Sequence, residues 1–111
     1  MPERPANPER LRRRFRRLAE ELGKVGWILH GTVRPRLLRT NAKTLGPYYQ
    51  WTFKEVGKTV TVNLSRAQLK PWQRAIREQR KLERLLDTMR QLSRDFLEAT
   101  IPGVKKRRPR P

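Results

Sequence analysis

The chain has 111 residues and a formal net charge of +18, because 28 residues are Lys or Arg and only 10 are Asp or Glu. A charge of this size opposes compaction and is normally balanced by a polyanion, which favours nucleic acid over an anionic membrane or an acidic protein as the partner. The lack of cysteine excludes disulfides, thiolate zinc sites and thiol catalysis.

The pattern along the chain predicts one α+β domain over residues 8–101, with a flexible lead-in over 1–7 and a disordered basic tail over 102–111. The domain is expected to contain an Arg-rich helix, a three-stranded antiparallel sheet and a long C-terminal helix. Residues 1–10 lack the apolar segment of a signal peptide. No apolar run approaches the roughly 20 residues of a membrane-spanning helix. We therefore expect a cytoplasmic protein, associated with the nucleoid or with ribonucleoprotein.

The first predicted element is a helix over residues 8–22. Asn7 can cap it, Pro8 is a favoured first residue, and Gly23 is expected to end it. An apolar stripe with helical spacing follows one face. Its members are Leu11, Phe15, Leu18 and Leu22.

Arginines crowd the N-terminal half of this helix, and carboxylates stand near its C-terminus. This order opposes the helix dipole, which suggests that a property other than stability selected the arginines. They are interpreted as phosphate contacts, and the alternative is a solvated charged face. The residues are Arg10, Arg12, Arg13, Arg14, Arg16 and Arg17.

An extended segment at about Thr32 to Arg39 is predicted as the first strand, at a sheet edge because it contains Pro35. A loop is expected from Thr40 to Pro47. Four cations of this region are expected to assist in phosphate binding. They are Arg34, Arg36, Arg39 and Lys43.

The segment from Tyr48 to Leu64 predicts a β-hairpin whose two faces differ in polarity. A two-residue loop at Val56-Gly57 and a four-residue loop from Glu55 to Lys58 give the same register. We expect the longer loop, because Val56 resists the positive φ of a tight type I′ turn. The apolar face is assigned to the core against the long helix. It pairs Phe53 with Val60, Trp51 with Val62 and Tyr49 with Leu64.

The opposite face of the hairpin is polar, pairing Lys54 with Thr59, Thr52 with Thr61 and Gln50 with Asn63. Its side chains suit base edges in a groove, and Tyr48 could stack on a base or ribose. An ordinary water-facing sheet has the same composition, so both interpretations stay open. The candidate base contacts are Tyr48, Gln50, Thr52, Lys54, Thr61 and Asn63.

A long helix is predicted over residues 66–99, opened by the capping box Ser65-Arg66-Ala67-Gln68. Pro71 is expected to kink or restart it. Its apolar seam has coiled-coil-like spacing. The seam can pack antiparallel against the first helix, or dock a second copy or a larger protein. It consists of Leu82, Leu85, Met89, Leu92 and Phe96.

The tail beyond Gly103 is basic and contains prolines, so it cannot form a core. We expect it to be a second, mobile phosphate-binding segment, and the alternative is an end without function. Its cations are Lys105, Lys106, Arg107, Arg108 and Arg110.

Catalytic groups are few. His30 is the one histidine. Asp87 and Asp95 share a helix face with interleaved arginines, which is typical of a salt-bridge ladder and not of a metal site. No phosphate-binding loop, dinucleotide fingerprint or nucleophile elbow is present. The sequence therefore predicts no enzyme, metal, cofactor or small-molecule substrate.

Three short motifs carry a resemblance: Gly31-Thr32, Gly46-Pro47-Tyr48-Tyr49 and Gly57-Lys58-Thr59, followed by the long charged helix. Over about residues 29–97 the chain resembles a family of small uncharacterised bacterial and archaeal proteins with a Cys-rich segment before H-G-P-Y-Y. The resemblance implies a shared fold and a loose association with mobile elements and DNA transactions. The Cys-rich segment is absent here, so a zinc-knuckle role of that loop is lost or replaced. The topology is also similar to the arm-binding modules of phage integrases.

The sequence thus predicts a non-catalytic nucleic-acid-binding protein, with DNA slightly preferred over structured RNA. It is expected to be an accessory subunit of a nucleoprotein complex or mobile element. The alternative is a protein-interaction or dimerisation module that docks on a larger nucleoprotein machine through the long helix.

Overall fold

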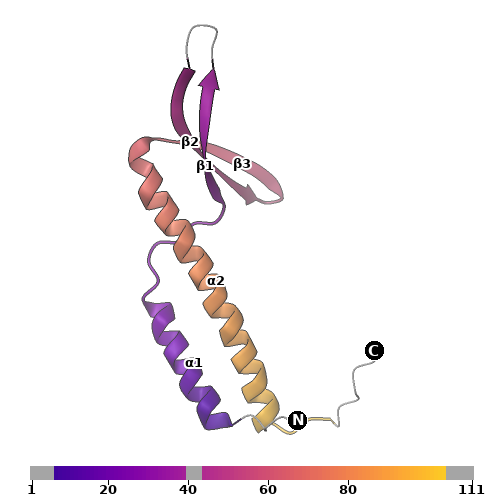
Figure 1. Cartoon of the computed structure of the whole chain (residues 1–111). Helices are drawn as coiled ribbons and strands as arrows, with labels where there is room; N and C mark the ends of the chain where they lie inside the picture. The colour runs from indigo at the N-terminus through magenta and orange to yellow at the C-terminus, as the bar shows by residue number, and fades with distance from the viewer. Residues whose placement is uncertain (1–6, 40–43, 105–111) are drawn as a thin grey trace, which may run out of the picture. The chain divides into compact units, whose positions relative to one another are not determined.

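A computed structural model describes residues 7–39 and 44–104 of the protein. The elements follow the order α1, β1, β2, β3, α2, which is the predicted α+β arrangement with a long C-terminal helix (Figure 1). Contacts group the described residues into two compact units. The helical unit combines residues 7–24 with 83–104, and the sheet unit holds Val25–Leu82. α2 supplies residues to both units. The single domain expected over residues 8–101 stays a prediction.

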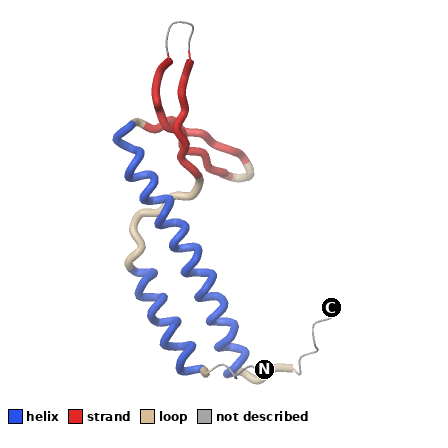
Figure 2. Tube along the Cα trace, viewed as in Figure 1, coloured by secondary structure: helices blue, strands red, loops and turns tan. Residues whose placement is uncertain are grey.

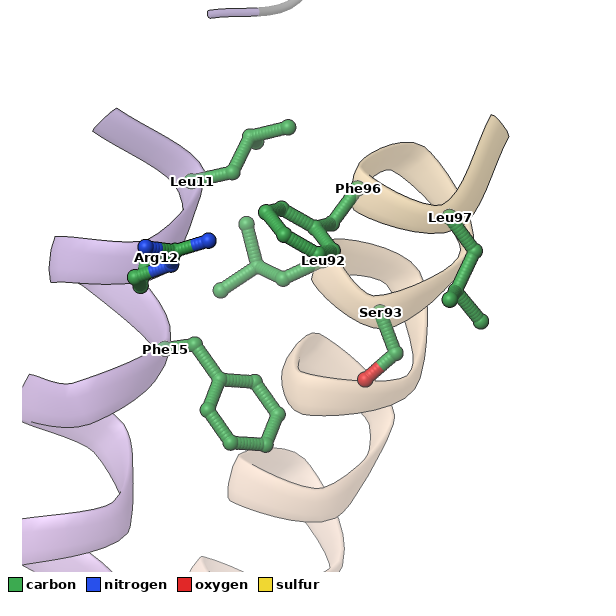
Figure 3. Close-up of a pocket in the computed structure, with 7 residues that line it drawn as sticks. All are labelled: Leu11, Arg12, Phe15, Leu92, Ser93, Phe96 and Leu97. Carbon is green, nitrogen blue, oxygen red and sulfur yellow. The ribbon is translucent and has the colours of Figure 1, made fainter. Parts of the chain in front are cut away.

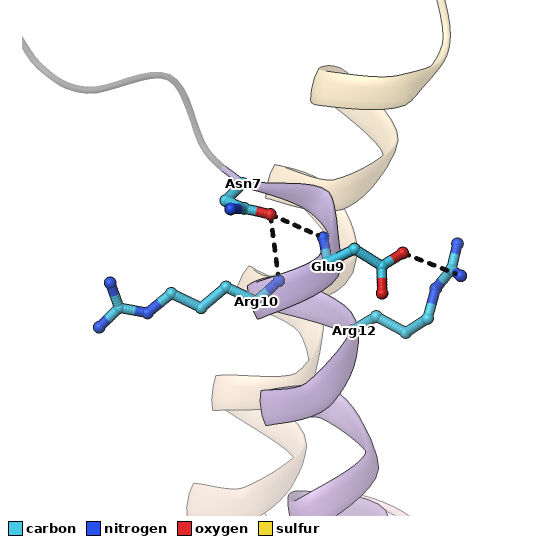
Figure 4. Close-up of polar contacts among 4 residues, drawn as sticks. All are labelled: Asn7, Glu9, Arg10 and Arg12. Atoms are coloured by element: carbon cyan, nitrogen blue, oxygen red, sulfur yellow. Dashed lines mark hydrogen bonds and ion pairs between the residues drawn. The ribbon is translucent and has the colours of Figure 1, made fainter.

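α1 spans Pro8–Gly23 and begins as predicted. The side chain of Asn7 accepts hydrogen bonds from the backbone N–H groups of Glu9 and Arg10, at 3.0 and 3.3 Å (Figure 4). Pro8 lies at the start, where its missing N–H costs nothing. The helix ends one residue later than expected, because Lys24 takes the C-cap position and donates its backbone N–H to Glu21.

Within the helical unit, α1 lies antiparallel beside the C-terminal half of α2 (Figure 2). Leu11 and Leu92 are buried, with 9% and 4% of their surface exposed. Phe15 and Phe96 lie near them and are half-buried. The apolar stripe of α1 and the seam of α2 therefore meet, as the intramolecular interpretation predicted.

The sheet unit contains a three-stranded antiparallel sheet in the order β1-β2-β3. β1 spans Thr32–Arg39, β2 spans Thr44–Glu55 and β3 spans Lys58–Leu64. The β2–β3 register confirms the predicted pairs, including Trp51 with Val62 and Gln50 with Asn63. β1 is an edge strand, as Pro35 indicated.

The expected loop from Thr40 to Pro47 is wrong at its C-terminal end, because β2 already begins at Thr44. The β1–β2 pairing passes from Arg36 opposite Tyr48 to Leu38 opposite Leu45, which leaves one residue of β1 against two of β2. This β-bulge contains Gly46 and Pro47, the residue types that suggest a loop in the sequence. A bulge accommodates the missing N–H of proline in a central strand.

The longer hairpin loop is also wrong. Glu55 pairs with Lys58, so the turn consists of Val56 and Gly57 alone, with φ values of 49° and 77°. Positive φ at a β-branched residue is unfavourable. The side chain of Val56 is 96% exposed and meets no neighbour that worsens the strain. The additional ladder pair and the matching twist of a tight turn offset this cost.

The apolar face of the sheet contacts the first half of α2, which spans Arg66–Thr100. The rings of Trp51 and Trp72 meet edge to face, with centroids 6.3 Å apart. Leu64 is buried with 3% of its surface exposed, whereas Val62 remains 38% exposed. The apolar face of the sheet thus lies toward α2, as predicted, but α2 covers only part of it. The small core is typical of a short and highly charged chain.

α2 begins at Arg66, and Gln68 accepts the backbone N–H of Ser65 at 2.8 Å, which is one half of the predicted capping box. The helix continues through Pro71 without the restart that the sequence allowed. The carbonyl that loses its helical donor belongs to Ala67, which is exposed, so water can bind it.

Gly31 fixes the entry into β1. Its φ of 104° lies in a region that other residues avoid, and a Cβ there would clash with the carbonyl oxygen of Thr52. Trp51 donates its indole N–H to the carbonyl of His30 at 2.8 Å. The backbone before β1 is therefore held directly against β2.

Candidate nucleic-acid interface

Four arginines of α1 recur at i, i+3, i+4 and i+7, so they form one stripe along the helix. We call Arg10, Arg13, Arg14 and Arg17 the α1 ridge. All four are exposed. Among the described residues, none of them makes an ion pair. The ridge is a row of about 10 Å in which each guanidinium is available to a phosphate.

The other two arginines of α1 differ from one another. Arg12 contacts Glu9 at 3.4 Å (Figure 4), and its guanidinium lies 5.3 Å from the ring centroid of Phe96. Part of its charge is therefore already balanced. Arg16 is exposed and makes no ion pair among the described residues, but it lies at the edge of the row that the ridge forms. The predicted set of six arginines is thus unequal, and the α1 ridge is its strongest part.

Carboxylates in the C-terminal half of α2 contact side chains of α2 itself. Arg90 pairs with Asp87 at 2.9 Å, and Arg94 pairs with Glu98 at 3.3 Å. Gln91 donates to Asp95 at 3.1 Å. This is the salt-bridge ladder that the interleaved charges indicated. Among the described residues, no three His, Asp or Glu side chains converge as metal ligands.

The polar face of the sheet extends across all three strands. Register places Arg34 opposite Gln50 and Arg36 opposite Tyr48, so two of the assisting cations lie in β1 and share the face of the candidate base contacts. Thr52, opposite Thr61, continues this face toward the hairpin turn. The face combines cations, amides and hydroxyls, which suits hydrogen bonding to nucleic acid.

A hydrogen-bonded row crosses this face. Arg36 Nε donates to Gln50 Oε1 at 3.0 Å, and Gln50 Nε2 donates to Asn63 Oδ1 at 3.3 Å. One acceptor and one donor position of the Gln50 amide are therefore occupied, so a bidentate base contact by Gln50 competes with this row. Asn63 and Lys54 are exposed at the free side of the sheet.

Several predicted contacts fall outside the part of the chain that can be described. Lys43 and the tail cations lie outside the described residues, and for Arg39 only the backbone, within β1, is described. Their assignment as phosphate contacts stays a prediction. The tail cations are Lys105, Lys106, Arg107, Arg108 and Arg110.

Sequence reasoning missed a second row of cations, in the first half of α2. We call Arg66, Lys70, Arg74 and Arg77 the α2 stripe. They recur at i, i+4, i+8 and i+11, and all four are exposed. The same helical spacing that identified the apolar seam could have revealed this stripe. Its members are separated by apolar residues of the same helix, so they do not form a continuous basic run in the sequence.

One member of the α2 stripe, Arg77, lines a polar groove of about 410 Å³ within the sheet unit. Arg34 from β1 lines it on one side, and Arg77 and Arg80 from α2 line the other. Gln73 and Thr32 add neutral hydrogen-bonding groups. Three guanidinium groups around one groove favour an anion, because each Arg offers several N–H donors.

The predicted interaction seam is mostly used inside the helical unit. Leu92 and Phe96 line an apolar hollow of about 290 Å³ together with Leu11 and Phe15 of α1 (Figure 3). Leu82, Leu85 and Met89 are half-buried. Leu97 also borders this hollow, and 52% of its surface remains exposed. The seam thus offers a partner less apolar surface than the sequence implied.

Among the described residues, no helix combines the length and the apolar composition needed to cross a membrane. Comparisons of the chain with protein-family models, with curated proteins and with solved structures found no match. The resemblance that the short motifs carry is therefore untested, and the functional argument rests on the chain's own residues.

Proposed function

We propose that the protein is a non-catalytic nucleic-acid-binding protein whose main phosphate contacts come from α1. One observation carries this proposal: the α1 ridge is exposed and makes no ion pair among the described residues. Unpaired arginines on one helix face repel each other, and a polyanion relieves that repulsion. The α2 stripe and Arg34 supply further contacts, and DNA remains slightly favoured over structured RNA.

The proposed role is that of an accessory subunit without catalytic activity, associated with the nucleoid or with a ribonucleoprotein. The polar sheet face supports it, because the candidate base contacts lie beside Arg34 and Arg36. The link to a mobile element rests on the resemblance alone. Nucleic acid, and no small molecule or cofactor, is the proposed ligand.

Two other partners have less support. A membrane-binding helix presents its apolar side to lipid, yet Leu11 on the apolar side of α1 is only 9% exposed. A docking role for the α2 seam needs an open apolar face, and α1 already covers Leu92, which is 4% exposed.

A salt titration tests the proposal. Labelled duplex DNA, structured RNA and single-stranded DNA are each titrated with the full chain at several salt concentrations. We expect a linear fall of log affinity against log salt, by about 0.9 per phosphate contact on duplex DNA. Weak binding to all three probes with no dependence on salt contradicts the proposal. A stable dimer that binds none of them favours the docking alternative.

A further inference from the structure

The segment between α1 and β1 presents the most exposed aromatic side chain among the described residues. Trp27 is 92% exposed, although indole rings usually bury most of their surface. Its neighbour Ile28 is 43% exposed. Exposing such a ring to water forgoes the stabilisation that burial brings, which marks it as a binding group more than a structural one.

The backbone that carries Trp27 is held on both sides. The N–H of Gly26 donates to Glu78 Oε1 at 3.1 Å, and the N–H of Leu29 donates to the carbonyl of Ala75 at 3.1 Å. Both acceptors belong to α2, within the sheet unit. Trp27 therefore projects from a segment fixed to a rigid helix. Because the backbone on both sides of Trp27 is already held, binding through its side chain costs less conformational entropy of the chain.

Cations stand beside this ring. Trp27 borders a hollow of about 380 Å³ that Lys70, Pro71 and Arg74 also line. Lys70 and Arg74 are members of the α2 stripe, are exposed, and make no ion pair among the described residues. Glu78 is the one carboxylate of the hollow, and it accepts the N–H of Gly26.

An exposed indole with two adjacent cations matches the chemistry of a nucleotide with an accessible base. The base stacks on the ring, and the cations contact the phosphates on either side. A base within a duplex is already stacked on its neighbours, so only an unpaired base can use the ring. A protein partner gains from the two unpaired cations only where it places carboxylates beside the ring, whereas every nucleotide carries a phosphate next to its base.

We propose that Trp27, with Lys70 and Arg74, forms a stacking site for an unpaired nucleobase in single-stranded or looped nucleic acid. This inference rests on the proposed function and adds a preference to it: the α1 ridge binds phosphates of any strand, and Trp27 favours strands whose bases are free.

The test compares Trp27→Ala and Trp27→Phe with the unsubstituted full chain. The probes are a labelled oligothymidylate and a duplex with the same number of phosphates. We expect Trp27→Ala to weaken oligothymidylate binding about tenfold while leaving the duplex affinity and the salt slope unchanged. Trp27→Phe keeps part of the stacking surface, so its loss is smaller. Val104→Ala is the control, because Val104 is 93% exposed and lies in the helical unit.

A second measurement uses intrinsic fluorescence. Oligothymidylate quenches the tryptophan emission of the unsubstituted chain, and Trp27→Phe loses most of this quenching while it still binds the labelled probe. Trp51 and Trp72 are half-buried and supply the remaining emission. Their spectrum, together with the circular dichroism, confirms that each variant is folded.

The outcomes separate the two proposals. Equal binding by Trp27→Ala and the unsubstituted chain overturns the stacking site and leaves the proposed function standing. An equal loss on duplex and oligothymidylate also overturns it, because the effect is then not base stacking. If the unsubstituted chain binds neither probe in a salt-dependent manner, both the proposed function and the stacking site fall.

Discussion

The helical unit and the sheet unit carry excess positive charge in different ways. In the helical unit, α2 pairs its own carboxylates with Arg90 and Arg94, and the α1 ridge is left without a partner among the described residues. In the sheet unit, cations lie among aromatic and amide groups: Trp27 borders the α2 stripe, and Arg36 donates to Gln50.

This difference suggests a division of work. A bare row of guanidinium groups supplies affinity that depends on salt and ignores sequence. Aromatic rings and amides depend on the state of the bases, because stacking and hydrogen bonding need accessible faces and edges. We therefore expect the helical unit to set affinity and the sheet unit to set the preference among nucleic acids.

Each unit has its own buried residues, so a core substitution can destabilise one unit and spare the other. Such substitutions have the largest expected effect. Leu64→Ala opens a cavity in the sheet unit and Leu92→Ala opens one in the helical unit, since these residues are 3% and 4% exposed. Each should lower the free energy of unfolding by about 2–5 kcal/mol. All three tryptophans lie in the sheet unit. Leu64→Ala should shift the fluorescence transition, and Leu92→Ala mainly the far-ultraviolet circular dichroism. A shift of the fluorescence transition by Leu92→Ala contradicts the comparison, whereas Leu64→Ala is also expected to change the dichroism of the part of α2 that belongs to the sheet unit.

Within the sheet unit, Gly31→Ala should cost about 1–3 kcal/mol of unfolding free energy, because it combines positive φ with a clash against Thr52. Gly57→Ala is the matched control. It also has positive φ, but no atom lies within 4 Å of its Cβ position. Chemical denaturation measures both variants. Equal losses would show that crowding at Gly31 contributes nothing.

The N-terminal cap of α1 provides the corresponding stability test in the helical unit. Asn7→Ala removes the acceptor for two backbone N–H groups and should destabilise the helix by about 1 kcal/mol. Asn7→Ser keeps an acceptor and should lose little. Amide hydrogen exchange at Glu9 and Arg10 checks this prediction. Unchanged exchange in Asn7→Ala would mean that the cap does not hold the first turn.

The smallest expected effect is a gain in stability at the hairpin turn. Val56→Asn replaces a β-branched residue at φ 49° with one that tolerates this conformation, and should stabilise the sheet unit by up to about 1 kcal/mol. Thermal unfolding followed by tryptophan fluorescence measures it. A lower midpoint would show that the Val56 side chain makes a contact that offsets its strain.

Much of the fold follows from local patterns, and the errors have local causes. Alternation of side chains set the β2–β3 register, and the capping residues set the starts of both helices. The start of β2 was missed because Gly46 and Pro47 suggest a loop, whereas a bulge keeps them in the strand. The turn was predicted wrongly because the strain at Val56 can be read from the sequence alone. The additional pair between Glu55 and Lys58, which favours the tight turn, cannot.

The candidate site was predicted less completely. Charge density located the arginines of α1, but only the geometry shows that Arg12 is engaged by Glu9 and Phe96 while the α1 ridge is not. The position of Arg34 and Arg36 on the polar face depends on pairing between distant segments, which charge alone does not reveal. The exposure of Trp27 is also not evident from the sequence, because a short apolar run such as Trp27-Ile28-Leu29 usually indicates a buried segment.

The central claim is that phosphates bind the unpaired arginines of α1, and a matched pair of double variants tests it most directly. One double variant carries Arg13→Gln and Arg17→Gln, and the other carries Arg90→Gln and Arg94→Gln. Both remove the same charge from the helical unit. Only the second pair already contacts carboxylates, Asp87 and Glu98. The salt dependence of duplex DNA binding is measured for both. We predict that the first variant loses about 1.8 from the log–log slope and about tenfold in affinity at low salt, while the second changes little. Equal losses in the two variants would show that binding follows net charge alone, and would contradict a site on α1.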